Sequence, residues 1–283
     1  MRERVLIVGC GYVGGRLAEL LVADGRTVYG LKRDPSTLPA GVEPVRADVS
    51  DPGSLAGLPA ADVMVYAVAP SGRTESAYRL AYVDGVRNVL AAVGRGDAPG
   101  RVILVSSTGV YGHDDGRRVD EETPPEPATL TGEIVLEGER ALLEAAPGGV
   151  VLRLGGIYGP GRNRTVRRVI RGEAGCPGPD RYGNRIHRDD AAGALRHLLA
   201  LPDPEPVYLG VDRDPAPLRE VYRWVAERAG VPDPCRAGEA VDPDEGRRGG
   251  NKRCSSDRLA ASGYEWHYPT FREGYATQVD ALR

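Results

Sequence analysis

The chain has 283 residues, of which 41% are hydrophobic, with a net charge of -3 and four cysteines. This hydrophobic content supports a sizeable core and excludes a chain that is disordered throughout. The small net charge gives no general attraction to nucleic acid or to an anionic membrane surface, so neither is expected as a partner. No apolar run reaches the roughly 20 residues of a membrane helix. No signal-peptide pattern opens the chain, so we expect a cytoplasmic protein.

The first predicted element is a buried strand at residues 5–8, which runs into a G-x-G-x-x-G turn and then a helix. Gly9 permits the tight turn, Gly11 lets the backbone approach a pyrophosphate, and Gly14 lets the helix pack on the strand. The free N–H groups and the positive dipole end of that helix favour a phosphate. The strand, turn and helix together therefore predict a dinucleotide site.

The rest of the first half alternates strand patterns with helix patterns. Further strands are expected at residues 27–31, 44–47, 62–67, 101–106 and 150–154, and helices at 78–93 and 132–146. This order predicts an α/β fold, a doubly wound parallel sheet of the Rossmann type with helices on both faces.

The composition changes after Gly161, because residues 162–185 are rich in arginine and glycine. Helices are expected at 165–172, 189–201 and 218–229, a short strand at 206–210, and a loop over the polar stretch 233–250. We expect residues 1–161, with 186–210 returning to them, to form a nucleotide-binding core. Residues 162–185 and 211–283 would form a smaller, interleaved C-terminal lobe for the substrate.

Arginines crowd the start of this second lobe: Arg162, Arg164, Arg167, Arg168 and Arg171. On a helix at 165–172 the last four share one face, because they are spaced three and four residues apart. Arginine suits phosphate and carboxylate groups, so an anionic small-molecule substrate is one interpretation. The other is a solvated face in a chain that is rich in arginine throughout.

The cysteines, Cys10, Cys176, Cys235 and Cys254, have no C-x-x-C spacing. Neither a zinc site nor a disulfide framework is therefore expected, and Cys176 is predicted to be a free thiol in a loop. No His/Asp/Glu cluster has the spacing of metal ligands, so no metal is expected.

Several blocks in order resemble the extended short-chain dehydrogenase/reductase superfamily, in its nucleotide-sugar epimerase and dehydratase group. They are Asp48-Val49 after the third strand, Ala67-Val68-Ala69-Pro70 after the fourth, Tyr82-Val83-Asp84-Gly85-Val86-Arg87-Asn88-Val89-Leu90, Ser106-Ser107-Thr108-Gly109-Val110-Tyr111-Gly112, Leu152-Arg153-Leu154-Gly155-Gly156-Ile157-Tyr158-Gly159-Pro160-Gly161, Asn184-Arg185-Ile186-His187-Arg188-Asp189-Asp190 and Asn251-Lys252-Arg253. The resemblance covers nearly the whole chain and implies a nicotinamide cofactor, but it leaves the substrate open.

The glycine turn and the resemblance together assign a set of residues to the cofactor. They are Gly9, Gly11, Tyr12, Val13, Gly14, Lys32, Arg33, Asp48, Val49, Ala67, Val68, Ala69, Gly156 and Ile157. Arg33 at the end of the second strand suits the 2′-phosphate of NADP. NAD is the alternative, since Asp34 could instead bond the ribose.

The chain departs from the superfamily at its Tyr-x-x-x-Lys pair, which supplies the proton and lowers the tyrosine's pKa. Aligned through Glu139, Thr131 stands at the tyrosine position and Val135 at the lysine position, and Tyr82 replaces a helix asparagine. A threonine hydroxyl is a far poorer proton donor than a phenol. The chain therefore resembles the atypical members that keep the fold without the pair.

The predicted catalytic residues are Ser107, Tyr111, Thr131 and Glu133. Ser107 stands at the superfamily's substrate-facing serine and would orient a carbonyl or hydroxyl, or else cap the end of its strand. Replacement proton donors are sought among Tyr111, Tyr82, Tyr158 and Glu133. His187 is expected to support the junction of the two lobes.

Three functions are compatible with this pattern. The first is an NADP-dependent oxidoreductase or epimerase/dehydratase-like enzyme that acts on a small hydroxyl or carbonyl compound with a non-standard proton donor. The second is a non-catalytic NADP-binding sensor or scaffold, and the third is a lyase or isomerase that uses the same pocket without redox chemistry. The helices before the strand at 150–154 form dimers in many members of the superfamily, so a homodimer is an alternative to a monomer.

Overall fold

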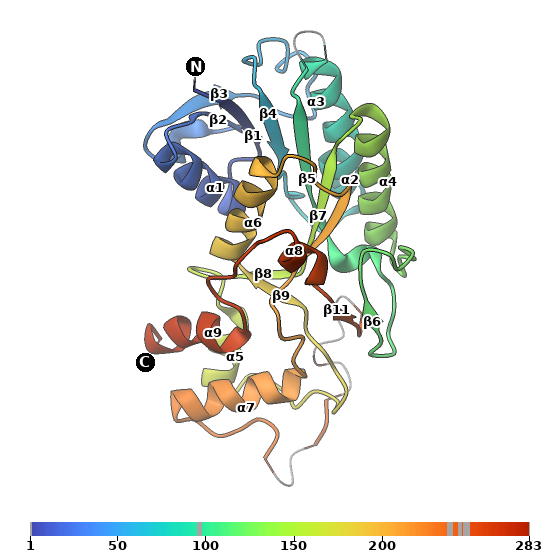
Figure 1. Cartoon of the computed structure of the whole chain (residues 1–283). Helices are drawn as coiled ribbons and strands as arrows, with labels where there is room; N and C mark the ends of the chain where they lie inside the picture. The colour runs from blue at the N-terminus through green and yellow to red at the C-terminus, as the bar shows by residue number, and fades with distance from the viewer. Residues whose placement is uncertain (1, 95–97, 237–239, 243–244, 246–249, 283) are drawn as a thin grey trace.

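The computed structural model describes residues 2–94, 98–236, 240–242, 245 and 250–282. Seven parallel strands form the central sheet in the order β3-β2-β1-β4-β5-β7-β10 (Figure 1). Their bounds are β1 Arg4–Val8, β2 Thr27–Lys32, β3 Val42–Arg46, β4 Val63–Tyr66, β5 Arg101–Ser107, β7 Val150–Leu154 and β10 Val207–Gly210. The strand order reverses direction between β1 and β4, which is where folds of this kind bind ligands.

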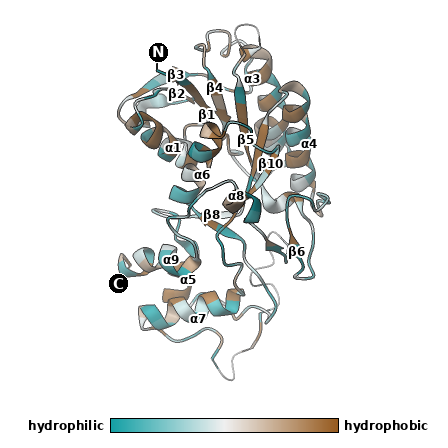
Figure 2. Cartoon of the chain, in the orientation of Figure 1, coloured by the Kyte–Doolittle hydropathy of each residue, from teal (hydrophilic) through white to brown (hydrophobic). Residues whose placement is uncertain are grey.

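Helices cover both faces of the sheet. On one face lie α1 Tyr12–Ala23 and α6 Arg188–Ala200; on the other lie α2 Glu75–Arg79, α3 Gly85–Val93 and α4 Leu130–Ala145. The strands β4 and β7 are buried at every residue, as expected for parallel strands between two helical layers. Figure 2 shows the apolar residues concentrated on these central strands.

The second lobe lies beyond the carboxyl ends of the strands and carries the C-terminus (Figure 1). Its helices are α5 Arg164–Ile170, α7 Leu218–Ala229 and α9 Phe271–Asp280, which pack around a separate apolar cluster that includes Val166, Val221 and Phe271. Two small parallel pairs join it to the core: β8 Gly156–Tyr158 with β9 Arg185–His187, and β6 Arg118–Val119 with β11 Arg253–Cys254. The short helix α8 Asp257–Ala261 follows β11.

Most predicted elements lie within one to three residues of their expected bounds, and the strand at 150–154 and the helix at 218–229 are confirmed to the residue. The helix expected at 78–93 is wrong in detail. It begins at Glu75 behind the N-cap Thr74 and is interrupted by a π-helical segment, Leu80–Asp84, between α2 and α3. The two small pairs, α8 and α9 were not expected. Within the described residues, no helix is both long and apolar enough to cross a bilayer.

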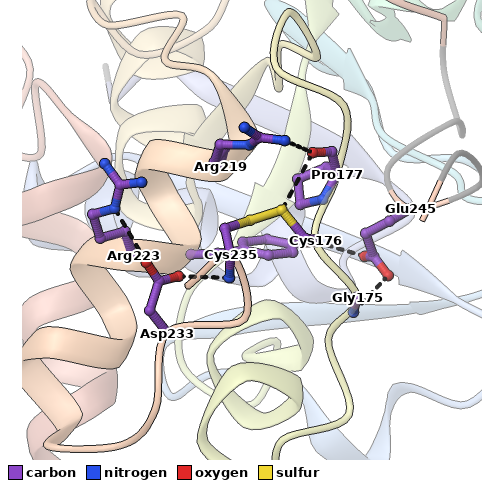
Figure 3. Close-up of a disulfide and its surroundings, with 9 residues drawn as sticks. Gly175, Cys176, Pro177, Arg219, Arg223, Asp233, Cys235 and Glu245 are labelled. Carbon is purple, nitrogen blue, oxygen red and sulfur yellow. Dashed lines mark hydrogen bonds and ion pairs between the residues drawn. A yellow bond between two sulfur atoms is a disulfide. The ribbon is translucent and has the colours of Figure 1, made fainter. Parts of the chain in front are cut away.

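The prediction that Cys176 is a free thiol is wrong, because Cys176 forms a disulfide with Cys235 (Figure 3). The two cysteines are 59 residues apart in the chain, so no local spacing predicts that they pair. They meet because the segment after α7 runs back along residues 175–177, where the Asp242 N–H donates to the Cys176 carbonyl. Part of the loop expected at 233–250 lies outside the described residues; its described part holds Cys235, Asp242 and Glu245.

Candidate functional site

A cavity of about 660 Å³ opens at the carboxyl ends of β1, β4 and β5. Twelve of the residues assigned to the cofactor line it: Gly9, Gly11, Tyr12, Val13, Lys32, Arg33, Asp48, Val49, Ala67, Val68, Ala69 and Ile157. Gly14 lies behind the turn, and Gly156 lines a neighbouring cavity in the second lobe. The cavity thus lies at the edge of the sheet where a doubly wound fold binds a dinucleotide.

The glycines of the first turn are required by their surroundings. Gly9 has φ +86°, and a Cβ there would lie 2.7 Å from the backbone of Ala67 and Val68. A Cβ on Gly14 would lie 2.6 Å from the Gly9 carbonyl oxygen, so its absence lets α1 start directly above β1. Both positions therefore exclude any side chain, which leaves the start of α1 open toward the cavity.

One end of the cavity is basic. Arg33 is exposed there and forms no ion pair with another described residue, whereas Lys32 donates a 2.8 Å hydrogen bond to the Thr37 hydroxyl. The Asp34 carboxylate accepts from the Ser36 N–H at 3.1 Å and caps a short 3-10 turn. Asp48 is held in the same way by the N–H and hydroxyl of Ser50, at 2.9 and 2.7 Å, which lowers the pKa of its carboxyl.

The other end of the cavity is lined by Ser106, Ser107 and Tyr82. The Ser107 hydroxyl accepts from the Gly109 N–H at 3.0 Å, so it caps the turn that follows β5 and faces the cavity as well. Ser107 can therefore cap the end of its strand and still face a substrate oxygen from the same position. Tyr82 comes from the π-helical segment between α2 and α3.

Behind this end lies a buried polar network that sequence reasoning missed. Glu139 on α4 and Arg153 on β7 are 1% and 4% exposed and are joined by hydrogen bonds of 2.7 to 3.2 Å. The Ser106 hydroxyl donates to Glu139 at 2.5 Å, and Arg153 donates to the Tyr111 hydroxyl, also at 2.5 Å. The network ties the floor of the cavity to α4 and β7.

A second cavity, of about 920 Å³, lies between β8, β9 and the helices of the second lobe. It shares Ile157 and Arg162 with the first cavity, so the two adjoin. All five arginines predicted to crowd this lobe line it: Arg162, Arg164, Arg167, Arg168 and Arg171. Arg168 is paired with Glu245 at 2.5 Å, while Arg164, Arg167 and Arg171 are free of ion pairs to the described residues.

Arg185 on β9 adds a buried charge to this second cavity. It is 5% exposed, and its terminal nitrogens have no hydrogen bond of normal geometry to a described residue. Its nearest carboxylate is Asp212, at 4.0 Å, and its guanidinium lies over the Phe271 ring at 5.5 Å. Burial raises the pKa of Asp212 to about 8, and Arg185 opposes that rise. A Cβ on Gly183 would lie 2.4 Å from the Arg185 guanidinium, so this glycine makes room for it.

A family model for the NAD-dependent epimerase/dehydratase family matches residues 5–173, which contain the glycine turn and the hydroxyl-lined end of the first cavity. The chain belongs to this family. A nicotinamide dinucleotide is therefore its cofactor class, and the seven-stranded parallel sheet is the sheet expected of it.

Relatives of known sequence or structure agree with the family. A 3-diazoavenalumate denitrifying reductase of Streptomyces is 30% identical over 267 residues, covering 85% of this chain and 86% of its own length. A structure from Methylobacillus flagellatus, assigned as an NAD-dependent epimerase/dehydratase, is 40% identical with a TM-score of 0.85 and covers 100% of both chains. A human epimerase family protein solved with NADPH shares the fold, at 22% identity and a TM-score of 0.78 over 98% of this chain and 99% of its own.

This member of the epimerase/dehydratase family has no Tyr-x-x-x-Lys pair at all, since its lysines are Lys32 and Lys252 and neither follows a tyrosine by four residues. The hydroxyls of Thr131 and Thr129 are 3.2 Å apart at the start of α4. Thr131 does not line the first cavity. Glu133 is exposed in the first turn of that helix. The geometry supports neither residue as the proton donor.

The two buried tyrosines proposed as donors also lie outside the first cavity. Tyr111 is 1% exposed; its hydroxyl donates to the Asp120 carbonyl and accepts from Arg153, and burial raises its pKa to about 12. Tyr158 lies in the second lobe, with its ring against His187 and Tyr275. Tyr82 is the one predicted replacement donor that lines the first cavity in the described structure.

Proposed function

We propose that this protein is an NADP-dependent oxidoreductase or epimerase of the atypical extended type, acting on a small anionic hydroxyl or carbonyl compound. The observation that carries this is the continuity of the two cavities. The first holds the glycine turn and ends at Ser107, and the second begins at the shared residues Ile157 and Arg162. A substrate held in the second cavity would meet the nicotinamide at Ser107.

NADP is favoured over NAD by the basic end of the first cavity. A 2′-phosphate is recognised by charge-assisted hydrogen bonds, and Arg33 has its guanidinium exposed at that end. Asp34, which would favour NAD, uses its carboxylate on the Ser36 N–H. The NADPH bound to the human family member is a precedent within the fold.

An anionic substrate is favoured by the charge of the second cavity. Arg185 at its wall is buried with a single carboxylate at 4.0 Å, and the exposed arginines of α5 surround the opening. Because a buried charge is costly unless a partner compensates it, a phosphate or carboxylate of the substrate would complete the site. Ser107 would then hold the reacting oxygen at the other end.

Two measurements test the cofactor. Native mass spectra of the purified protein would identify any retained NADP or NAD and its redox state, and a fluorescence titration with NADPH and NADH would rank the two. Tightly retained oxidised cofactor would favour an internal redox cycle of the epimerase kind. A protein that retains neither and binds neither would overturn the oxidoreductase assignment.

Anion binding is tested with inorganic phosphate and malonate as probes on the NADP-loaded protein at constant ionic strength. Arg185→Met should weaken the binding of these anions about tenfold or more, since it removes a charge-assisted hydrogen bond. Above the pKa of Asp212, at pH 9, Asp212→Asn should tighten it, because it removes the competing carboxylate. A purely structural Arg185–Asp212 pair predicts no such opposite response. Arg196→Met, at a surface pair with Asp24, is the control.

A non-catalytic NADP sensor is the second candidate, and the missing Tyr-x-x-x-Lys pair is the observation that favours it. Such a protein would bind NADPH in the titration above but reduce none of a panel of small carbonyl compounds. Thr131→Tyr combined with Val135→Lys would separate the two cases. A gain of reductase activity in that variant would indicate a site that had lost its chemistry.

A further inference from the structure

The helical segment between α2 and α3, which contributes Tyr82 to the lining of the first cavity, is distorted by a side chain from the sheet. Tyr66, at the end of β4 and 1% exposed, donates its hydroxyl to the Ala81 carbonyl at 2.6 Å. The Gly85 N–H, which would bond Ala81 in a regular α-helix, bonds the Leu80 carbonyl instead. A side chain inserted into the helical ladder is a recognised cause of such a π turn.

Glycines make this distortion possible. A Cβ on Gly85 would lie 2.4 Å from the Tyr66 hydroxyl, so only glycine leaves room for the inserted phenol. On the other side, a Cβ on Gly138 of α4 would lie 2.1 Å from the Tyr82 carbonyl oxygen. The backbone of Tyr82 is therefore held between β4 and α4, and its side chain lines the cavity beside Ser106 and Ser107.

The ring of Tyr82 lies near one of the two positions where the superfamily has its Tyr-x-x-x-Lys pair. Together with Tyr78, it packs against the buried apolar cluster that contains Val135, the residue at the superfamily's lysine position. Its ring stacks on Tyr78 with 5.9 Å between centroids. Among the described residues, none exchanges a hydrogen bond with its hydroxyl, in contrast to Tyr111 and Tyr12. The phenol is therefore free to bond a ligand in the cavity.

We propose that Tyr82 is the proton donor of this enzyme, presented to the reacting oxygen by the π turn that Tyr66 creates. Because this role requires a bound nicotinamide, it rests on the proposed function. In the reductive direction a bound reduced nicotinamide would supply the hydride to the carbonyl carbon and would itself be oxidised. The Tyr82 O–H bond breaks as the substrate's O–H bond forms, and solvent returns a proton to the phenolate.

The surroundings of Tyr82 suit an acid that stays protonated. Burial raises the pKa of its phenol to about 12, with the nearby Tyr78 and Glu139 acting in the same direction. A phenol of this pKa is neutral at physiological pH. It is still a stronger acid than the alcohol that forms from the substrate, so proton transfer to the reacting oxygen is favourable. No neighbouring lysine is then needed to keep the donor in its active form in the direction of reduction.

The kinetic test compares Tyr82→Phe with Tyr78→Phe in NADPH-dependent reduction of a panel of 2-oxo acids and phosphorylated aldehydes. Tyr78 is the matched control, since it stacks on Tyr82 but does not line the cavity. Tyr82→Phe should lower kcat on the order of 10²–10⁴-fold with NADPH affinity within about twofold. Tyr78→Phe should retain kcat. Equal kcat values for Tyr82→Phe and wild type would overturn the assignment.

A second readout needs no substrate. With 3-fluorotyrosine placed at position 82, or at 78 as control, the ¹⁹F resonance of position 82 alone should shift when NADPH is added. If wild-type protein binds neither NADPH nor NADH, the proposed function fails and Tyr82 has no such role. If NADPH binds but the resonance at 82 does not move, the cofactor assignment stands and the role of Tyr82 is refuted.

Discussion

The buried pair of Glu139 and Arg153 gives a quantitative test of how this core holds charge beneath the cofactor cavity. Both residues are at least 95% buried and share three hydrogen bonds of 2.7 to 3.2 Å. Removing one partner leaves the other charge buried without compensation, which costs about 3–5 kcal/mol. We therefore expect Glu139→Leu and Arg153→Met each to lower the free energy of unfolding by that amount.

The double variant should behave differently from the sum of the single variants. It removes both charges and places apolar side chains of similar volume in the same space. The attraction within a buried pair is largely offset by the desolvation of the two charges, so such a replacement is often close to neutral. The double variant should therefore be more stable than either single variant by at least about 2 kcal/mol.

Urea unfolding followed by far-ultraviolet circular dichroism at neutral pH measures these differences. The surface pair of Arg196 and Asp24 is the control, because an exposed pair contributes about 1 kcal/mol or less. A double variant no more stable than the weaker single variant would refute this reasoning. Such a result would mean that shape and hydrogen bonding at the site matter more than the two charges.

Three further outcomes are expected. Arg33→Ser should weaken NADPH binding about tenfold or more in a fluorescence titration and leave NADH binding unchanged; an equal loss for both cofactors would contradict a 2′-phosphate contact. Replacing Cys176 and Cys235 by serine should lower the free energy of unfolding by about 2–4 kcal/mol, and wild type in reductant should match the variant. Burial lowers the pKa of His187 to about 4, so the unfolded chain takes up a proton below its ordinary value of 6.5 before the folded one does. His187 should then cost up to about 3 kcal/mol of stability as pH drops from 6.5 toward 4, so over this range wild type should lose that much stability relative to His187→Gln in urea titrations at several pH values. Asp212, whose raised pKa acts in the opposite direction, is present in both proteins and cancels in this difference.

Local signals sufficed for much of the fold and for the cofactor half of the site. The strand and glycine turn at residues 5–14 are adjacent in sequence, so their spacing alone places a dinucleotide against the start of α1. The strand at 150–154 is a continuous apolar run interrupted by one arginine, and the helix at 218–229 has a clear apolar face ended by Gly230.

The remaining features depend on contacts between distant segments. The π turn requires the hydroxyl of Tyr66 from β4, and no sequence pattern within the helix indicates this contact. Cys176 and Cys235 meet only because the chain returns along residues 175–177 after α7. In the sequence, Arg185 belongs to one of the blocks that resemble the superfamily, and nothing there marks it as buried. Its burial against Asp212 results from the packing of β9 beside the second lobe, which no local pattern indicates.

The disulfide also has a topological consequence. The ring that it closes, from Cys176 to Cys235, contains β9, α6, β10 and α7, so one covalent loop threads through both the central sheet and the second lobe. A protease that cuts the exposed connection between α6 and β10 would leave two fragments still joined through sulfur. On a gel without reductant the nicked protein would migrate as a single species, and reductant would release two. The bond thus holds together a lobe that the chain enters and leaves more than once.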